Sequence, residues 1–405
     1  MSGEGPVPGI GFARFLEADP DRLHVAAHSH HPWPDVTFDG QREAWFDAAR
    51  LMDRKWDHVF GTVLPEVQQW VARRLALPDP GTVAVAPNTH ELLMRIVSCL
   101  EPPLRILTTD GEFASFERQV RRLAEEGLAE VERIPVAPVD SLVERLSQAA
   151  ADGGHDLVYV SHVLFTSGAV VGDLDGLVAA VRDDATFVVI DGYHGFMALP
   201  TDLSGVAGRA FYLAGGYKYA MAGEGVCFAH CPPGYGPRPR DTGWFADFDA
   251  RPAAPAQQVT YAAGGRRFLG ATFDPTALYR FNAVQRWLAT TGWTVGGIHE
   301  HVAGLQRRFL AALAERPLAG LDVATLTSAP GVRPHGHLLA FDHADAAGVC
   351  AALAGQGVVA DHRGTRVRIG FGIYHDADDI GELVARLAVL DLPTPPTTPR
   401  LEHRP

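Results

Sequence analysis

Lysine is scarce in this chain: Lys55 and Lys218 are its only two lysines, although lysine and arginine together number 35. Aspartate and glutamate number 48, so the formal net charge is −13 at pH 7. A chain with this acidic excess lacks the basic surface on which non-specific binding to nucleic acid or to an anionic membrane depends. We therefore expect neither partner, and each lysine becomes a candidate for a specific role.

Cysteine and long apolar runs are also lacking. The four cysteines show neither the pairing of a disulfide framework nor the spacing of a zinc ribbon, so we expect free thiols in a reducing compartment. No apolar run reaches the roughly 18 residues of a membrane span. The first residues lack the basic and apolar regions of a signal peptide. These features favour a soluble, cytoplasmic protein.

Two common nucleotide-binding motifs are absent from the sequence. No G-x-G-x-x-G follows a first strand, and no G-x4-G-K-[ST] occurs, so a nicotinamide- or nucleotide-binding enzyme lacks support. A cofactor-free binding protein is a further alternative. The presence of both Asp191 and Lys218 argues against it.

Short apolar runs alternate with helical periods through the middle of the chain. This alternation predicts an α/β fold with a large three-layer αβα domain and a mainly parallel, mixed sheet. We expect strands at 82–86, 104–109, 131–136, 156–161, 186–190, 210–214 and 225–230, and helices at 91–100, 116–127, 141–151 and 174–181.

The pattern divides the chain into two parts. We expect a large domain over residues 12–275, which begins with a helical segment at 12–75, and a smaller C-terminal α/β domain over 276–392. The glycine- and proline-rich residues 1–11 and 393–405 are expected to be flexible ends. In the smaller domain we expect strands at 336–341 and 365–369 and helices at 345–356 and 376–389.

Lys218 lies in a loop of small residues that follows a predicted strand. Asp191 directly follows the predicted strand at 186–190, and His194 lies three residues after Asp191. Ligands bind beyond the carboxyl ends of parallel strands, where all three residues fall. Pyridoxal phosphate (PLP) needs a lysine for its aldehyde and a carboxylate for its pyridinium nitrogen. The three residues therefore predict a PLP site, whereas Lys218 taken alone is more typical of an exposed turn.

Several other residues occupy positions suited to holding a phosphate or a flat ring. Asn88, Thr89 and His90 open a predicted helix, where backbone N–H groups bind phosphate, although any N-cap has this composition. Phe113 can stack on a ring or fill the core. Ser161 ends a strand at the same edge of the sheet, and Thr272 lies in a glycine loop where a turn residue is equally common.

Two features favour a substrate pocket. Arg368 lies on a predicted strand, and its planar guanidinium suits bidentate capture of a carboxylate. His30 belongs to the run His28-Ser-His-His31, next to Trp33. Alternating histidines can bind zinc, but no cysteine or carboxylate is adjacent, so we expect no metal. Loop residues that face solvent are the remaining alternative for this run.

Together these motifs resemble the class V, fold type I PLP-dependent enzymes, specifically the kynureninase-like branch, over roughly residues 20–390. The resemblance implies the fold type I architecture and a homodimer in which Thr272 reaches the phosphate of the second subunit. It implies that Tyr217 and Trp244 contact the cofactor, that Phe113 stacks on its ring, and that Arg368 and Tyr374 face the substrate. It departs from the branch at Phe116, which stands in place of an aspartate, at Ala27–Trp33 and at His375.

The expected function is that of a PLP-dependent enzyme that acts on an amino acid. An aldimine with Lys218 and a carbanion at Cα are the expected chemistry, with Asp191 and His194 as the other catalytic residues. The resemblance implies kynureninase-like cleavage at Cβ, and class V transamination is the alternative. Desulfuration needs a reactive cysteine on a mobile loop, and Cys350 lies in a helical pattern.

Overall fold

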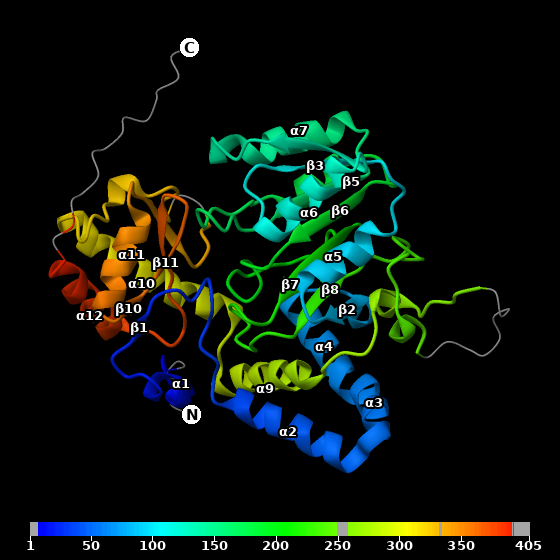
Figure 1. The fold of residues 1–405 in the computed structure, drawn as a ribbon, viewed down its shortest axis with the longest axis horizontal. Coiled ribbons are helices and arrows are strands. Elements are labelled where there is room, and N and C mark those ends of the chain that lie inside the picture. Colours follow the sequence, from blue (N-terminus) through cyan, green and yellow to red (C-terminus); the bar gives the residue numbers. More distant parts are fainter. Residues whose placement is uncertain (1–6, 249–257, 332–333, 391, 393–405) are drawn as a thin grey trace.

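The computed structural model describes residues 7–248, 258–331, 334–390 and 392. The predicted flexible ends lie largely outside this part of the chain. Within it, Gly9 N–H donates to the carbonyl of Ile373, and the carbonyl of Gly11 accepts from Asp35 N–H. Figure 1 shows a large sheet with helices around it and a smaller group of helices and strands on the other side of the molecule. No helix of the described residues is long and apolar enough to cross a membrane.

A seven-stranded sheet forms the centre of the larger part. Its strands are β2 (Val83–Ala86), β3 (Leu104–Thr109), β4 (Ala129–Ile134), β5 (Leu157–Ser161), β6 (Phe187–Asp191), β7 (Ala210–Gly215) and β8 (Cys227–His230). Their order is β2-β8-β7-β6-β5-β3-β4, and β8 alone runs antiparallel to its neighbours. The predicted α/β class and mainly parallel sheet are confirmed.

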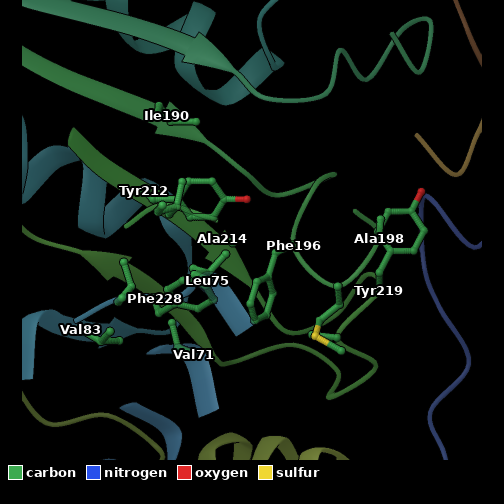
Figure 2. Close-up of a cluster of buried hydrophobic side chains, with 14 of the residues drawn as sticks. Val71, Leu75, Val83, Ile190, Phe196, Ala198, Tyr212, Ala214, Tyr219 and Phe228 are labelled. Carbon is green, nitrogen blue, oxygen red and sulfur yellow. The ribbon is translucent and has the colours of Figure 1, made fainter. Parts of the chain in front are cut away.

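Alternating side chains of the central strands fill two separate cores. Val158 and Val160 of β5 belong to one core, whereas Leu157 and Tyr159 belong to the other. Because successive strand residues point to opposite faces, both faces must be covered. Helices α4 (Leu64–Leu75), α7 (Leu142–Asp152) and α8 (Leu174–Ala180) cover the first face, and α5 (Thr89–Val97) and α6 (Ala114–Glu125) cover the second. Figure 2 shows part of the first core.

The smaller part has its own hydrophobic core. Helices α10 (Val295–Glu315), α11 (Ala346–Gly355) and α12 (Ala377–Ala388) pack with β9 (Leu339–Asp342), β11 (Asp361–Arg363) and β12 (Arg366–Ile369). The three strands lie in the antiparallel order β11-β12-β9. Strand β1 (Leu23–His24) pairs with β10 (Val358–Val359), so the N-terminal segment also contributes to this part. The sequence did not predict β1, β10 or β11, which have only two or three residues each.

Helix α9 (Thr276–Thr291) lies beside α2 (Val36–Leu51), as Figure 1 shows along its lower edge. Phe281, Val284 and Leu288 of α9 belong to the first core of the large sheet. Ile298 of α10 also belongs to the first core, whereas Val302 belongs to the core of the smaller part, so the two cores divide within α10. The domain boundary at residue 276 stays a prediction.

The remaining elements are short. They are α1 (Ala13–Glu17), α3 (Lys55–His58), the π-helical turn at Val59–Val63, and the 3-10 turns at Met52–Arg54, Pro80–Thr82, Val139–Ser141, Trp244–Asp247, Gly264–Phe268 and Val323–Thr325. Helices α2 to α4 agree with the helical character predicted for the N-terminal segment. The carboxyl ends of β2, β3, β5, β6 and β7 meet at one edge of the sheet.

Candidate active site

Lys218 lies in the loop that follows β7, at the carboxyl edge of the sheet. Its side chain is 5% exposed. The loop is tightly packed: a Cβ atom on Gly216 would lie 2.5 Å from the side chain of Val226, so a residue without a side chain is needed there. The glycine at position 216 therefore lets the backbone of the lysine loop pack closely against Val226, in a loop whose lysine is buried.

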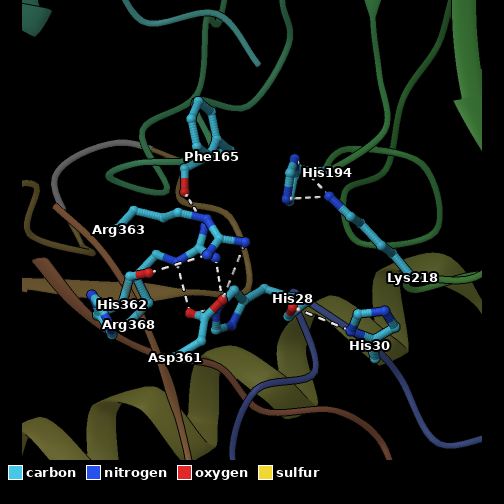
Figure 3. Close-up of polar contacts among 10 residues, drawn as sticks. His28, His30, Phe165, His194, Lys218, Asp361, His362, Arg363 and Arg368 are labelled. Carbon is cyan, nitrogen blue, oxygen red and sulfur yellow. Dashed lines mark hydrogen bonds and ion pairs between the residues drawn. The ribbon is translucent and has the colours of Figure 1, made fainter. Parts of the chain in front are cut away.

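The amine of Lys218 contacts His194. Lys218 Nζ lies 2.6 Å from His194 Nε2, which is 6% exposed (Figure 3). Burial lowers the pKa of Lys218 to about 7, and the charge of Asp191 opposes this effect. Burial, helped by the charge of Lys218, also holds the pKa of His194 well below its usual range. The pocket therefore favours two neutral nitrogen bases in hydrogen-bonding contact.

Asp191 is the last residue of β6 and directly follows four buried strand residues. Its Oδ2 accepts a hydrogen bond from the Tyr159 hydroxyl at 2.8 Å, and its Oδ1 accepts one from Tyr193 N–H at 2.9 Å. Burial raises the pKa of this carboxyl, and the two hydrogen bonds only partly oppose the rise. A buried carboxylate of this kind is stabilised by a cationic partner, because an unpaired buried charge is costly.

Aromatic rings surround the lysine. Lys218 Nζ lies 5.0 Å from the ring centre of Tyr193, 5.6 Å from that of Phe113 and 5.8 Å from that of Tyr217. Phe113 contacts Phe165 edge to face, with ring centres 5.4 Å apart. The structure thus brings two sequence candidates, Phe113 and Tyr217, to the lysine. Such rings supply flat apolar walls that suit a planar ligand.

The first turn of α5 lies at the same edge of the sheet, as the sequence predicts. The side-chain Oδ1 of Asn88 accepts from Glu91 N–H, and its Nδ2 donates to the Glu91 carboxylate, both at 2.9 Å. Asn88 is therefore the N-cap of the helix, and its side chain is occupied by this role. Thr89 and His90 follow as the first helical residues, whose backbone N–H groups suit an anion.

Ser161 is bound to a residue that the sequence did not single out, Glu112. The Ser161 hydroxyl and N–H both donate to Glu112 Oε2, at 2.6 and 3.0 Å, and the Thr109 hydroxyl donates to Oε1 at 2.6 Å. Burial raises the pKa of Glu112 to about 7, although the hydrogen bond from Ser161 opposes the rise. Glu112 thus links the ends of β3 and β5 directly beside Phe113. In the sequence, the one signal for Glu112 as a site residue is its position shortly after a predicted strand.

Phe116, which stands where the kynureninase-like branch has an aspartate, lies in the core. Its ring stacks on that of Tyr159, with centres 3.6 Å apart and an interplanar angle of 5°. Phe116 is 2% exposed. The ring therefore supports the tyrosine whose hydroxyl binds Asp191, rather than a polar ligand.

Arg368 on β12 donates three hydrogen bonds to two groups, shown in Figure 3. Its Nε donates to Asp361 Oδ1 at 2.8 Å, its Nη2 also donates to Asp361, and its Nη1 donates to the Phe165 carbonyl at 2.8 Å. His28 Nε2 lies 2.8 Å from the same Asp361 Oδ1. Burial raises the pKa of Asp361, but the bonds with His28 and Arg368 outweigh it and leave that pKa well below its usual range.

The histidine run lies against the lysine loop. His31 N–H donates to the Tyr217 carbonyl at 3.4 Å, and the rings of His30 and Tyr217 lie 5.6 Å apart. His30 is exposed, whereas His28 and His31 are buried, so the pocket role of His30 stays a prediction beside the alternative of a solvent-facing loop residue. The described residues contain no group of three or more histidines, cysteines or carboxylates able to hold a metal ion.

Three sequence candidates make contacts that do not lead to Lys218. Trp244 Nε1 donates to the Thr272 hydroxyl at 3.1 Å, and Trp244 is 53% exposed. Tyr374 is 4% exposed, and its hydroxyl donates to the His24 carbonyl at 2.8 Å. The roles of Trp244 and Thr272 toward a cofactor, and of Tyr374 toward a substrate, stay predictions.

The thiols are not arranged as nucleophiles. All four cysteines are free. Burial raises the pKa of Cys99, Cys227 and Cys231 to about 12 and that of Cys350 to about 11. A thiol acts as a nucleophile when it ionises readily, and burial disfavours the thiolate form of these four cysteines.

A hollow of about 220 Å³ lies away from the lysine, among side chains of Leu142, Val143, Leu164 and Val170. Its lining is mainly apolar and contains no lysine, histidine or cysteine. The chemistry of the side chains therefore places the candidate active site at Lys218 instead.

Comparison with known proteins gives a consistent assignment. The family described as aminotransferase class-V matches residues 60–383. Isopenicillin N epimerase of Streptomyces clavuligerus is 32% identical over 174 residues, which cover 41% of this chain and 43% of the epimerase, less than half the length of that relative.

Two solved structures of C-DES share the fold. The cystine C–S lyase C-DES in complex with cysteine persulfide has a TM-score of 0.78 and 19% identity, covering 92% of this chain and 98% of its own. A C-DES mutant with glycine covalently linked to the PLP cofactor has a TM-score of 0.76 and 19% identity, covering 93% and 99%. At this level of identity, the likeness concerns the fold.

Proposed function

The chain belongs to the class V aminotransferase family, and on that premise we propose that it removes the Cα proton of an amino acid and then cleaves a bond at Cβ. It is a PLP-dependent enzyme of this family. Bound PLP supplies an electron sink for the electrons of the Cα–H bond. The proposal concerns the residues that act and the bond that breaks.

The residues at the sheet edge fit PLP. Asp191 is a buried carboxylate whose pKa is raised, so a pyridinium N–H would provide the cationic partner that it lacks. Lys218 is the proposed attachment residue, and the first turn of α5 at Thr89 and His90 is the proposed phosphate site. Phe113 is proposed to stack on the cofactor ring, and Tyr217 to lie next to the phosphate. Ser161 is proposed to stabilise the site through its hydrogen bonds to Glu112.

Lys218 is the proposed base that takes the Cα proton. A buried amine with a pKa near 7 is neutral in a large fraction of molecules at physiological pH, as a base must be. His194 Nε2, at 2.6 Å, is placed to hold the amine in one orientation and to exchange its proton.

Arg368 is proposed to bind the α-carboxylate of the substrate. Its guanidinium is fixed in place by Asp361 and by the Phe165 carbonyl, so little conformational freedom is lost when a carboxylate binds. His28 fixes Asp361 in turn. These contacts orient the Arg368 guanidinium. A carboxylate bound to it would in turn orient the Cα–H bond of the substrate relative to Lys218.

Cleavage at Cβ needs a group that protonates the departing atom. Tyr217 directly precedes Lys218, and the ring of His30 lies next to that of Tyr217, so these two side chains are the proposed proton donors. Desulfuration through a cysteine is disfavoured, because burial raises the pKa of all four thiols. Transamination uses the same lysine and the same acid, and it is the alternative that the following experiment separates.

The observation that carries the proposal is the contact of a buried, readily neutral Lys218 with His194. We suggest incubating the PLP-loaded protein with uniformly ¹³C-labelled amino acids and identifying the products by NMR. Cβ cleavage yields a three-carbon product, alanine or pyruvate. Recovery of the full carbon skeleton as a keto acid, dependent on an added keto-acid acceptor, would show transamination instead. Lys218→Ala is the control for both.

A homodimer is also proposed. Trp45, Phe46 and Met52, at the end of α2 and just beyond it, are 68%, 56% and 67% exposed, and Trp244 is 53% exposed. Large apolar side chains so exposed are typical of interfaces. Sedimentation velocity would test this: a single dimeric species is expected, and a Trp45→Glu/Phe46→Glu variant should sediment as a monomer. A cytoplasmic location stays a prediction.

A further inference from the structure

The hairpin formed by β11 and β12 carries more positive than negative charge on the face that bears Arg368. Asp361 pairs with Arg368 across the two strands, and Arg363 pairs with Arg366. Residues that pair across strands, and residues two apart along a strand, share a face, so these four side chains belong to one face. Three arginines thus share this face with Asp361.

Two of the arginines have carboxylate partners within the protein. Arg368 makes a bidentate pair with Asp361 and is 3% exposed, but its Nη1 and Nη2 each carry a second N–H that can donate to a bound carboxylate. Arg366 Nε lies 3.3 Å from Asp342 Oδ1 on the neighbouring strand, and its Nη1 donates to the Thr166 carbonyl at 3.5 Å. The charge of Arg366 is thereby matched by Asp342.

Arg363 is different. Its Nη2 lies 3.9 Å from Asp361 Oδ2, beyond hydrogen-bonding distance, and its Nη1 donates only to the neighbouring His362 carbonyl at 3.2 Å. Asp361 already accepts from Arg368 and contacts His28, so it has little capacity left for a further cation. The Arg363 side chain is 51% exposed. It therefore keeps donors that can meet an incoming anion.

Arg363 also faces the lysine. In Figure 3 its side chain extends from the hairpin in the same direction as that of Arg368, toward the side where His194 and Lys218 lie. Burial lowers the pKa of Lys218, and the charge of Arg363 is close enough to add to that effect. Burial raises the pKa of Tyr217 to about 12, and the same charge opposes that rise.

We propose that Arg363 binds a second anionic group, so that the substrate is an amino acid with an acidic side chain. Arg368 on β12 binds the α-carboxylate. Arg363, which lies two positions after Asp361 on β11, binds the carboxylate or other oxyacid group of the side chain. This inference rests on the proposed function only for the role of Arg368. A neutral side chain would leave the Arg363 charge uncompensated at the pocket, which disfavours amides of the same size.

Binding without turnover tests this proposal. α-Methyl-L-glutamate and α-methyl-L-glutamine lack the Cα proton, so calorimetric titration of the PLP-loaded protein measures affinity whatever the enzyme does at Cβ. We expect wild type to bind the acid roughly tenfold more tightly than the amide, the ratio expected for one charge-assisted contact. Arg363→Gln should bind the two equally, and Arg363→Lys should keep part of the preference.

Arg366→Gln is the matched control, because Arg366 lies on the same face but is paired with Asp342. It should keep the wild-type preference. Equal affinities in wild type, no binding of either compound, or a preference that survives in Arg363→Gln would each overturn the proposal. A failure of Cβ cleavage in the NMR experiment leaves these affinities unchanged, so the two proposals fail separately.

Discussion

Lys218 Nζ and His194 Nε2 lie 2.6 Å apart in a pocket where both side chains are at least nine-tenths buried. The lysine is kept there against its preference for water, because burial favours the neutral amine. A chain that retains such a costly residue among apolar and aromatic neighbours gains from its reactivity rather than from its packing. This relationship underlies the predictions that follow.

The burial of Lys218 destabilises the cofactor-free protein. Between pH 7 and 10.5 the unfolded chain holds a proton on this lysine that the folded chain has released, so its contribution makes the free energy of unfolding rise with pH. Below pH 7 the full cost is present, about 5 kcal/mol. Lys218→Met should therefore be more stable than wild type at pH 6.5, with the difference vanishing near pH 10.5 in urea titrations. A difference that does not change with pH would contradict this account.

Asp191→Asn should weaken PLP binding. The amide keeps the size of the side chain. Its oxygen can still accept from Tyr193 N–H, and its NH2 can donate to the Tyr159 hydroxyl oxygen, but it loses the charge proposed to pair with the pyridinium. Breaking a buried pair costs about 3 kcal/mol, so we expect a loss of affinity on the order of 100-fold in absorbance titrations with PLP. The exposed Asp202→Asn serves as control and should bind as wild type does. Unchanged affinity in Asp191→Asn would remove the aspartate from the cofactor site.

Phe116→Ala should destabilise the fold by about 3–5 kcal/mol, the usual cost of deleting a buried phenyl ring. The ring stacks on Tyr159 and is 2% exposed. Because Tyr159 binds Asp191, PLP affinity should fall as well. Phe116→Leu should recover most of the stability, as measured by urea unfolding. A stable Phe116→Ala variant with normal PLP affinity would show that the stack supports neither.

Arg368→Gln should raise KM for the substrate by on the order of 100-fold, because a charge-assisted bidentate contact is lost. The value of kcat should change much less, since the lysine and the acid are intact. Arg368→Lys should restore only part of the loss, because an ammonium lacks the planar fork. Steady-state kinetics on the folded variants would measure this. A fall in kcat at unchanged KM would instead place Arg368 in the chemical step.

The sequence was informative where a residue acts through its position on a strand. Asp191 and Lys218 follow apolar runs, and parallel strands end at one edge, so their proximity could be predicted from order alone. The same reasoning placed Asn88 and Phe113 at that edge. Alternation and helical periodicity predicted the strands of the large sheet, because each is buried and bounded by turn residues.

The parts that the sequence missed depend on contacts between distant segments. Strand β1 has two residues and exists because it pairs with β10, more than three hundred positions along the chain. In the sequence Glu112 is typical of a turn residue, and only the folded structure shows its hydrogen bond with Ser161. The link from His28 through Asp361 to Arg368 likewise joins both ends of the sequence. No local sequence pattern predicts such pairs, since their members lie far apart in the sequence and meet only in the folded chain.

The most direct test of the central claim uses the two lysines of the chain. The PLP-loaded protein is reduced with borohydride, digested and mapped by mass spectrometry. We predict one pyridoxyl adduct per chain, on Lys218, with Lys55 unmodified, and a Lys218→Ala variant that keeps its fold but retains no adduct. An adduct on Lys55, or no adduct on wild type after incubation with PLP, would contradict the account.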